Sequence, residues 1–304
     1  MPTDIVEKIL RLKRDRNAVI LAHTYQPGEV QDIADFVGDS YGLSVKAAET
    51  PAEVIVFCGV MFMAETAAIL NPAKEVIIPD PRAGCPMADM ITAADLAALK
   101  QQYPEYAVLC YVNSPAEVKA LSDICVTSSN ALAIARQVPA ETGILFVPDK
   151  HLGSWVQEQT ERVMVMWEGF CPTHVRITPA MLARARSEHP HATILIHPEA
   201  PRESRVLADQ VLSTGGMCAF AAHSDATEFI IGTEIGVLHT LRKRNPQKRF
   251  SCVDESITCP NMRRGSLDKV EKALAGEGGM RVTVPQDIAD RARGSLEKML
   301  AMSG

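Results

Sequence analysis

Three Cys-Pro dipeptides at nearly equal spacing are the feature of this sequence that most constrains its fold. Their cysteines are Cys85, Cys171 and Cys259, which are separated by 86 and 88 residues. Random placement of 8 cysteines and 19 prolines among 304 residues would produce fewer than one such pair on average. A spacing this regular indicates that the chain contains a threefold internal repeat.

The same order of residues recurs within each repeat. An apolar strand comes first, over 18–25, 106–113 and 192–199, and each leads into a Pro-x-Glu typical of a helix start, at Pro27, Pro115 and Pro201. An aspartate follows each proline by eight residues and a hydroxyl residue by thirteen: Asp35, Asp123 and Asp209, then Ser40, Ser128 and Thr214. Two more apolar strands follow in each unit, over 54–59 and 75–80, 144–149 and 162–169, and 229–234 and 249–254.

Continuous apolar strands that alternate with helices predict parallel sheets covered by helices on both faces. The sequence therefore predicts an α/β fold of three homologous αβα parallel-sheet domains, related by pseudo-threefold symmetry around a central active site. The expected domains are 1–88, 89–174 and 175–261, and units of this size should pack together because each is small for independent folding. Segment 262–304 holds no fourth unit, and its last helix, from Ile288 to Leu300, is expected to pack on the first unit with the N-terminal helix.

Polar residues stand at the ends of the three first strands. In open parallel sheets the ligand binds beyond the carboxyl ends of the strands. A purely structural repeat would tend to keep interchangeable apolar residues at these ends, so six polar side chains in register predict a site on the shared axis. They lie four and two residues before the prolines: His23 and Tyr25, Tyr111 and Asn113, His197 and Glu199.

The hydroxyl residues Ser40, Ser128 and Thr214 are expected to cap helix N-termini. Backbone amides and the helix dipole attract anions at such termini. Three of them on one axis predict a ligand with several carboxylates or a phosphate. The segment LSTGG (212–216) adds backbone freedom for a close approach, but no GxxxxGK[ST] or GxGxxG motif supports a nucleotide.

The three Cys-Pro loops should also meet on the axis, where their thiolates would form a tripod. A structural zinc site normally has four ligands in short paired spacings such as CxxC, which this sequence lacks. Three thiolates suit either a catalytic zinc ion or a 4Fe–4S cluster with one iron not bound by cysteine. Such an iron could assist the loss of water as a Lewis acid. The other five cysteines are expected to be small apolar packing residues.

Composition argues against other classes of protein. A net charge of −6 argues against a nucleic-acid partner held by phosphate contacts. No apolar run reaches the ~18 residues needed to span a bilayer, so no membrane association is expected. The N-terminus lacks the features of a signal peptide, which predicts a cytoplasmic protein whose thiols stay reduced.

Several of these motifs resemble the quinolinate synthase family. The resemblance rests on AHTYQPGEVQDIADFVGDS (22–40), CYVNSPAEVKALSDICVTSSN (110–130), IHPEAP (196–201), LSTGG and the Cys-Pro loops, and it covers essentially the whole chain. It implies three α/β domains around a central site, with three cysteines holding an oxygen-sensitive 4Fe–4S cluster. The implied reaction condenses iminoaspartate with dihydroxyacetone phosphate to quinolinate, phosphate and water in NAD biosynthesis. L-aspartate oxidase is the implied supplier of iminoaspartate.

The resemblance also implies roles for particular residues. The implied cluster ligands are Cys85, Cys171 and Cys259, and the implied catalytic residues are His23, Tyr25, His174, His197 and Glu199. The implied substrate-binding residues are Ser40, Tyr111, Asn113, Ser128, Ser213, Thr214 and Gly215. Some members carry a C-terminal CxxCxxC, which is absent here, so redox control through that motif is not expected.

Two other classes of protein could use the same cysteines. A zinc-dependent hydrolase or dehydratase would be colourless and indifferent to air. A non-enzymatic iron–sulfur sensor would need no ring of His, Tyr and Glu side chains, and it would usually hold its cluster with four cysteines.

Overall fold

Three α/β units follow one another along the chain. The structure is a computed structural model and describes residues 2–303. The first unit comprises α1 (Pro2–Asp15), β1 (Ala18–His23), α2 (Gly28–Ile33), β2 (Phe36–Gly38), α3 (Ser40–Glu49), β3 (Val54–Cys58), α4 (Met61–Leu70), β4 (Glu75–Ile78) and the 3₁₀ helix η1 (Ala88–Met90). The second comprises α5 (Ala93–Gln102), β5 (Ala107–Tyr111), α6 (Ala116–Ala120), β6 (Ile124–Val126), α7 (Ala131–Gln137), β7 (Ile144–Val147), α8 (Lys150–Thr160), β8 (Met164–Met166) and η2 (His174–Arg176).

The third unit repeats this order and a C-terminal segment follows it. The unit comprises α9 (Pro179–Glu188), β9 (Thr193–Ile196), α10 (Arg202–Arg205), β10 (Gln210–Val211), α11 (Thr214–His223), β11 (Glu228–Gly232), α12 (Val237–Arg244), β12 (Arg249–Cys252) and η3 (Met262–Arg264). The segment adds α13 (Leu267–Ala275), β13 (Met280–Arg281) and α14 (Gln286–Ala301). Within residues 2–303, no helix combines the length and apolar character needed to cross a bilayer.

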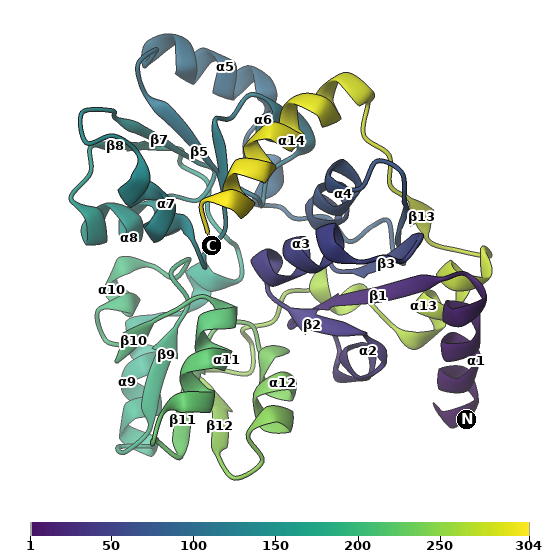
Figure 1. The fold of residues 1–304 in the computed structure, drawn as a ribbon. Coiled ribbons are helices and arrows are strands. Elements are labelled where there is room, and N and C mark those ends of the chain that lie inside the picture. Colours follow the sequence, from purple (N-terminus) through teal and green to yellow (C-terminus); the bar gives the residue numbers. More distant parts are fainter. Residues whose placement is uncertain (1, 304) are drawn as a thin grey trace.

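Each unit contains a parallel sheet with the same strand order. The orders are β2-β1-β3-β4, β6-β5-β7-β8 and β10-β9-β11-β12, and the three sheets surround a common centre (Figure 1). The register is equivalent as well, because Leu21 pairs with Phe57, Leu109 with Phe146 and Leu195 with Ile231. Helices cover the sheets, so the central strands are buried, and full burial of one such leucine stabilises the fold by about 1.5–3 kcal/mol. The predicted α/β class with threefold pseudosymmetry is confirmed.

The repeated aspartates have a structural role within their own units. Each lies at the start of a short strand that the sequence did not predict, and its carboxylate accepts a hydrogen bond from an amide of the neighbouring first strand. The three bonds join Asp35 to Ile20 at 2.8 Å, Asp123 to Val108 at 2.8 Å and Asp209 to Ile194 at 2.7 Å. Each sheet therefore has four repeated strands rather than three. The missed strands have two or three residues, too few to show a periodic pattern.

The predicted helix starts are correct to within two residues, but the predicted caps are wrong. The prolines are N-caps of α2, α6 and α10 rather than first helical residues. Ser40 and Thr214 are the first residues of α3 and α11, whereas the capping side chains belong to Asp39 and Ser213. Ser128 lies before α7, which begins after Asn130. At the starts of α3 and α11 two consecutive residues are able to cap, and the earlier one accepts the amide hydrogen bond, whereas the N-cap residue of α7, Asn130, makes no side-chain cap hydrogen bond.

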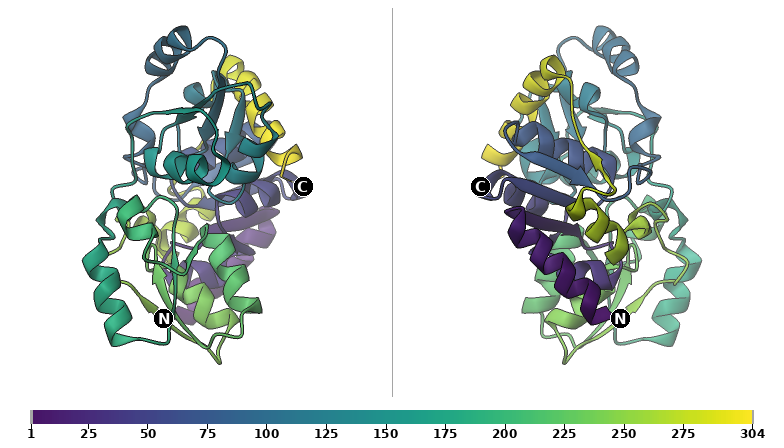
Figure 2. Two further views of the ribbon diagram at one scale, coloured as in Figure 1. Left: turned by 90° about the vertical axis from the view of Figure 1, so that its left-hand side faces the viewer. Right: turned by 90° about the vertical axis from the view of Figure 1, so that its right-hand side faces the viewer.

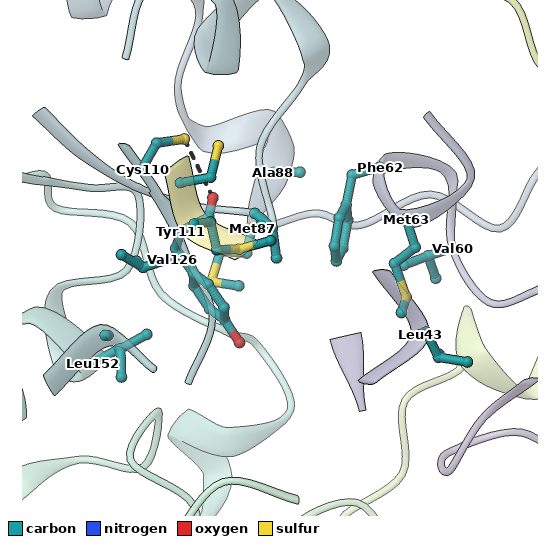
Figure 3. Close-up of a cluster of buried hydrophobic side chains, with 14 of the residues drawn as sticks. Leu43, Val60, Phe62, Met63, Met87, Ala88, Cys110, Tyr111, Val126 and Leu152 are labelled. Carbon is teal, nitrogen blue, oxygen red and sulfur yellow. Dashed lines mark hydrogen bonds between the residues drawn. The ribbon is translucent and has the colours of Figure 1, made fainter. Parts of the chain in front are cut away.

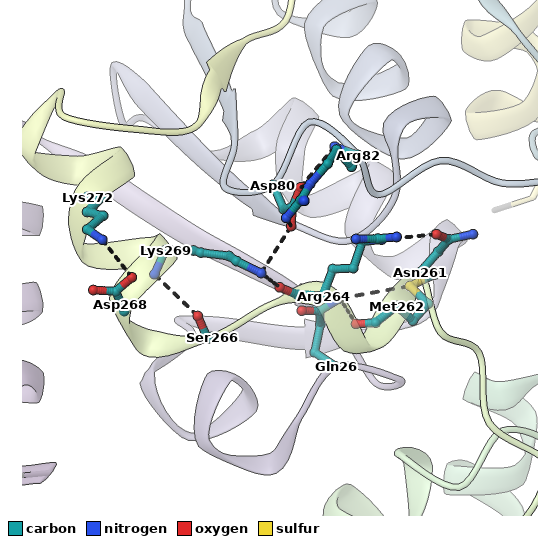
Figure 4. A network of polar contacts seen from close by, with 10 residues as sticks. All are labelled: Gln26, Asp80, Arg82, Asn261, Met262, Arg264, Ser266, Asp268, Lys269 and Lys272. Carbon is teal, nitrogen blue, oxygen red and sulfur yellow. Dashed lines mark hydrogen bonds and ion pairs between the residues drawn. The ribbon is translucent and has the colours of Figure 1, made fainter.

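The C-terminal segment contacts two units, which corrects one expectation. Helix α13 packs beside α1, and β13 adds an antiparallel strand to β4 of the first sheet (Figure 2). Lys269 of α13 forms an ion pair with Asp80 at 3.0 Å, and Gln26 donates to the carbonyl of Met262 at 2.7 Å (Figure 4). Helix α14, however, packs mainly on α6 and β6 of the second unit and reaches α4 of the first (Figure 1). The prediction that the last helix packs on the first unit is therefore correct only in part, because its buried face of Ala292, Leu296 and Met299 bridges two units.

Candidate active site

The carboxyl ends of the strands converge on one central cavity. Its volume is about 130 Å³. Thirteen of the fifteen predicted site residues line it: His23, Tyr25, Ser40, Cys85, Tyr111, Asn113, Ser128, Cys171, His174, His197, Glu199, Thr214 and Cys259. The other two, Ser213 and Gly215, flank Thr214 at the start of α11. Equivalent residues of the three units, such as Cys85, Cys171 and Cys259, are at least 86 positions apart in the chain. They share one site because the three sheets face a common axis.

The three Cys-Pro loops have the same local geometry. Each leads into a 3₁₀ helix, and the amide three residues after the cysteine hydrogen-bonds its sulfur, at Ala88, His174 and Met262. Each cysteine carbonyl accepts from the amide four residues on, at Asp89, Val175 and Arg263. Amide donors of this kind favour a thiolate and hence a bound metal.

Burial disfavours the thiolate form of all three Cys-Pro cysteines and so raises the pKa of each. Burial, together with the neighbouring Cys259, raises the pKa of Cys85 to about 12. Burial raises the pKa of Cys171 well above its usual value, and Glu199 and Cys85 add to the effect. Deprotonation of three such thiols requires compensating positive charge, which a bound metal supplies.

Two buried carboxylates lie behind the cysteine loops. Glu234, at 0% exposure, accepts from the amides of Cys259 at 3.2 Å and Gly236 at 2.6 Å and pairs with Arg263 at 3.3 Å. Asp149 faces the amide of Cys171 in the equivalent position. Burial raises the pKa of both carboxyls, and for Asp149 Glu199 raises it further. Sequence analysis missed both residues, although they end equivalent second strands with the motifs VPD and GTE.

Glu199 is the centre of a buried polar cluster. One carboxylate oxygen accepts from the hydroxyl of Tyr111, and the other lies 2.7 Å from Nδ1 of His174. That same Nδ1 lies 3.2 Å from the sulfur of Cys171. Burial opposes ionisation of Glu199, but the charge of His174 and the hydrogen bonds from His174 and from the hydroxyl of Tyr111 hold the pKa of this carboxyl below its usual range. Glu199 is therefore ionised at neutral pH.

The buried Thr233 continues this cluster toward the first unit. Its hydroxyl lies 2.7 Å from Nε2 of His174 and 2.6 Å from the hydroxyl of Tyr25. Tyr25 in turn lies 2.7 Å from the hydroxyl of Thr214. Burial raises the pKa of both Tyr25 and Tyr111 well above 10.0, so both phenols are protonated at rest. Thr233 is another residue that sequence analysis missed.

His23 and His197 occupy equivalent positions and share one hydrogen-bonding arrangement. Nδ1 of His23 accepts from the amide of Tyr25 at 3.1 Å, and Nδ1 of His197 accepts from the amide of Glu199 at 3.3 Å. Burial lowers the pKa of His23 to about 4 and that of His197 to about 3, so both rings are neutral at neutral pH. An accepting Nδ1 assigns the ring proton to Nε2, which is then a donor for a ligand. The ring of His197 also stacks on that of His174 with centroids 4.5 Å apart.

Helix starts from all three units meet at one part of the cavity wall. Asp39 caps α3 through the amide of Gly42 at 2.9 Å, and it also accepts from the amide of Gly215 at 3.2 Å. The hydroxyl of Ser129 donates to Asp39 at 2.5 Å and lies 2.8 Å from Oγ of Ser213. Ser213 and Gly215 thus hold this corner of the cavity together, and Asp39 is a lining residue that sequence analysis missed.

Apolar and unpaired polar groups complete the cavity. Val60, Phe62 and Met87 form an apolar wall beside Tyr111 (Figure 3). Asn113 contributes a buried Oδ1 that has no hydrogen-bond partner within residues 2–303. Because a buried amide oxygen without a partner is costly, this oxygen is a candidate acceptor for a ligand donor.

The side chains that could hold a small ion differ from the cysteine tripod. Among residues 2–303, the group whose ligand atoms all lie within 4.8 Å of one another is Cys171, His174 and Glu199. The sulfurs of Cys85, Cys171 and Cys259 do not form so compact a group.

Comparison with known proteins agrees with this site. A family model described as Quinolinate synthetase A protein matches residues 7–301. The chain belongs to the quinolinate synthase family. It is 51% identical over 296 residues to a quinolinate synthase of Dehalococcoides mccartyi (strain CBDB1), covering 97% of each chain. It is 49% identical over 303 residues to one of Caldicellulosiruptor saccharolyticus, covering 98% of this chain and 99% of the relative.

A third relative is almost as similar. The quinolinate synthase of Methanosarcina barkeri is 48% identical over 299 residues and covers 98% of each chain. The resemblance found in the sequence motifs is thus confirmed over nearly the full length. Membership of the quinolinate synthase family makes this chain an enzyme.

Proposed function

We propose that this enzyme condenses iminoaspartate with dihydroxyacetone phosphate to form quinolinate, with release of phosphate and water, for NAD biosynthesis. The observation that carries the proposal is the convergence of the family's polar strand ends and its three Cys-Pro loops on one cavity. Both substrates are small anions, and the cavity wall combines helix N-termini with hydroxyl and amide groups suited to carboxylates and phosphate. Relatives at 51% identity carry the name quinolinate synthase.

Cys85, Cys171 and Cys259 are the proposed ligands of a 4Fe–4S cluster. Three thiolates on one tetrahedral zinc ion would lie about 3.8 Å apart, because each Zn–S bond measures about 2.3 Å. Among residues 2–303, the three cysteines are not a group whose ligand atoms all lie within 4.8 Å of one another, which favours a multinuclear cluster over zinc. When bound, a cluster with three cysteine ligands supplies an open iron that acts as a Lewis acid.

The protein side chains supply binding and proton transfer. Tyr111, Asn113, Ser128 and Thr214 would hold the carboxylates of iminoaspartate, and Ser40, Ser213 and Gly215 would support anion binding at the helix starts. The ionised Glu199 is the proposed general base, and the protonated Tyr25 is the proposed acid for the triose-derived carbons. His23 and His197 are neutral, so they would donate hydrogen bonds through Nε2 to substrate oxygens rather than act as imidazolium acids.

The chemistry of iminoaspartate indicates how this substrate must be supplied to the enzyme. This imine hydrolyses readily in water, so an enzyme that forms it by oxidising L-aspartate must supply it nearby. L-aspartate oxidase is the proposed supplier. A cytoplasmic location is proposed because reduced thiols are required for the cluster ligands.

Anaerobic purification followed by an activity assay tests the proposal. We expect a brown protein with about four iron atoms per chain and quinolinate formation from the two substrates. Cys171→Ala should lose the visible absorption and the activity together. The matched control Cys252→Ala, which replaces a half-buried cysteine of β12, should keep both. A colourless, air-stable wild-type enzyme containing zinc, or full activity in Cys171→Ala, would overturn the proposal.

A further inference from the structure

Three equivalent helix positions carry buried side chains that donate hydrogen bonds from one unit to another. Gln31, Lys119 and Arg205 each lie four residues after the helix-start proline of their unit, and all three are buried. Their acceptors are backbone carbonyls of other units: Gly236 at 3.0 Å for Gln31, Phe62 at 3.1 Å for Lys119 and His151 at 2.8 Å for Arg205.

The three acceptors occupy equivalent positions as well. Each lies five residues after a second-strand residue that is paired in the same register, namely Ile231, Phe57 or Phe146. The bonds therefore link the units in a ring, from the first to the third, from the third to the second and from the second to the first.

In the first unit the same donor also holds the segment that carries Tyr25. Nε2 of Gln31 donates to the carbonyls of Thr24 and Gln26, at 2.9 Å and 2.8 Å. These two residues flank Tyr25 in the chain, and among residues 2–303 neither carbonyl has another hydrogen-bond partner. Loss of the Gln31 amide would therefore leave two acceptors of buried residues unpaired beside Tyr25.

In the third unit Arg205 holds the segment that carries Glu199 in the same way. Its Nη1 donates to the carbonyls of Pro198 and Ala200, at 3.2 Å and 3.0 Å, which flank Glu199. Among the described residues these carbonyls also have no other partner.

The other end of the Arg205 guanidinium is fixed to the second unit. Nη2 lies 3.3 Å from Oγ of Ser154 and 3.1 Å from the carboxylate of Glu158, and both residues belong to α8. A buried guanidinium is costly because it leaves water, and an apolar side chain of similar length could fill the same space. An apolar side chain could not, however, hold two carbonyls of one unit against a helix of another.

We propose that Gln31 and Arg205 are positioning residues, which fix Tyr25 and Glu199 in the cavity by tying each strand-end segment to a neighbouring unit. Lys119 makes the equivalent bond between units, but its second partner is Thr66 of α4, at 3.0 Å, so it holds no strand end. The inference rests on the proposed function, because it takes Tyr25 and Glu199 to act on the substrate.

Steady-state kinetics of the anaerobic holoenzyme test the proposal first. Arg205→Met and Gln31→Met keep the approximate length of the side chain but remove the donors. Each should lower kcat by about 10–100-fold and change the KM of either substrate by less than about twofold, because a displacement of about 1 Å can cost that much in rate. Arg202→Met is the matched control, since exposed Arg202 pairs with the same Glu158 at 3.1 Å, and it should leave kcat unchanged. A wild-type kcat in both Arg205→Met and Gln31→Met would overturn the proposal.

A double substitution separates positioning from general stability. In the Glu199→Gln background, Arg205→Met should lower kcat by less than about threefold further, because the group that it positions is already lost. The same factor in both backgrounds would overturn the proposal. If Arg205→Met does not fold, Arg205→Lys allows the same comparison, since a single amine keeps the charge but lacks the fork that reaches both units.

Hydrogen–deuterium exchange of the same holoenzymes needs no substrate. The amides of Glu199 and Ala200 should exchange at least about tenfold faster in Arg205→Met than in wild type and at the wild-type rate in Arg202→Met. Unchanged exchange in Arg205→Met would overturn the proposed tie. If the wild-type holoenzyme forms no quinolinate, the proposed function fails instead, while the exchange rates still report whether Arg205 holds this segment.

Discussion

The repeated aspartates and the strand ends of the same units differ in what they bond to. Asp35, Asp123 and Asp209 are identical in the three units, and each accepts from an amide of its own sheet. The strand ends differ between units except for the equivalent His23 and His197. Several of the differing side chains bond across units, as Tyr111 does with Glu199 and Tyr25 with Thr214. Identical residues stabilise each sheet by itself, whereas differing residues build a site that belongs to no single unit.

The largest expected effect is a loss of activity when the strand-end residue Glu199 is substituted. Glu199→Gln keeps the volume of the side chain but removes the carboxylate, so the proposed base is lost. We expect kcat to fall by about 10²–10⁴-fold, the usual contribution of a general base, with a nearly unchanged thermal midpoint. Glu203→Gln makes the same change at an exposed position of α10 and should leave kcat unaltered. Near-normal activity in Glu199→Gln would show that this strand-end residue is not needed for the reaction.

The next effect is acid sensitivity caused by a buried strand-end histidine. Burial lowers the pKa of His23 from 6.5 to about 4 in the folded protein. Between these values the unfolded chain binds a proton that the folded chain does not, so the free energy of unfolding falls as the pH drops through this window. The loss should be on the order of 3 kcal/mol for this residue.

Urea unfolding at several pH values measures this dependence. His23→Asn, whose side-chain oxygen can replace Nδ1 as the acceptor, should show a flatter decline between pH 6.5 and about 4. His223→Gln is the control, since His223 is exposed at the end of α11. An identical decline in His23→Asn and wild type would show that this ring is already accessible to protons in the folded enzyme.

The smallest effect is expected at a repeated aspartate. Asp123→Ala removes the acceptor of the Val108 amide, which should lower the free energy of unfolding by about 1–2 kcal/mol. Activity at a temperature well below the midpoint should stay at the wild-type level. Asp268→Ala removes an exposed partner of Lys272 and should change stability by less than about 0.5 kcal/mol. If Asp123→Ala lost most of its kcat while keeping its stability, this aspartate would have a role in catalysis rather than in the stability of its sheet.

The sequence allowed the fold and most of the site to be predicted because the repeat supplied its own alignment. Strand ends that fall in register must lie at one edge, so His23, Tyr111 and His197 could be placed together without coordinates. The elements on which α14 packs could not be predicted in this way. Its apolar face shows that it packs, but the residues it packs on, in α6 and α4, have the same character as those of many other surfaces.

Two kinds of site residue escaped the sequence analysis for different reasons. Glu234 and Asp149 end equivalent second strands, so the register that revealed the first-strand ends also contained these carboxylates. Thr233 has Pro148 in the equivalent position and gives no repeated signal. Its importance depends on bonds to Tyr25 and His174 of other units, and such bonds are visible only when the units are assembled.

Carrying three units on one chain has a consequence for how such a site can diversify. A homotrimer of a single unit would place three copies of the same side chain at every axial position. It could hold a symmetric group through three identical cysteines, but it could not combine Tyr25, Asn113 and Glu199 at one level of the axis. Covalent linkage lets each axial position vary alone while the sheets keep their shared pattern. An asymmetric substrate can then be bound by a nearly symmetric protein.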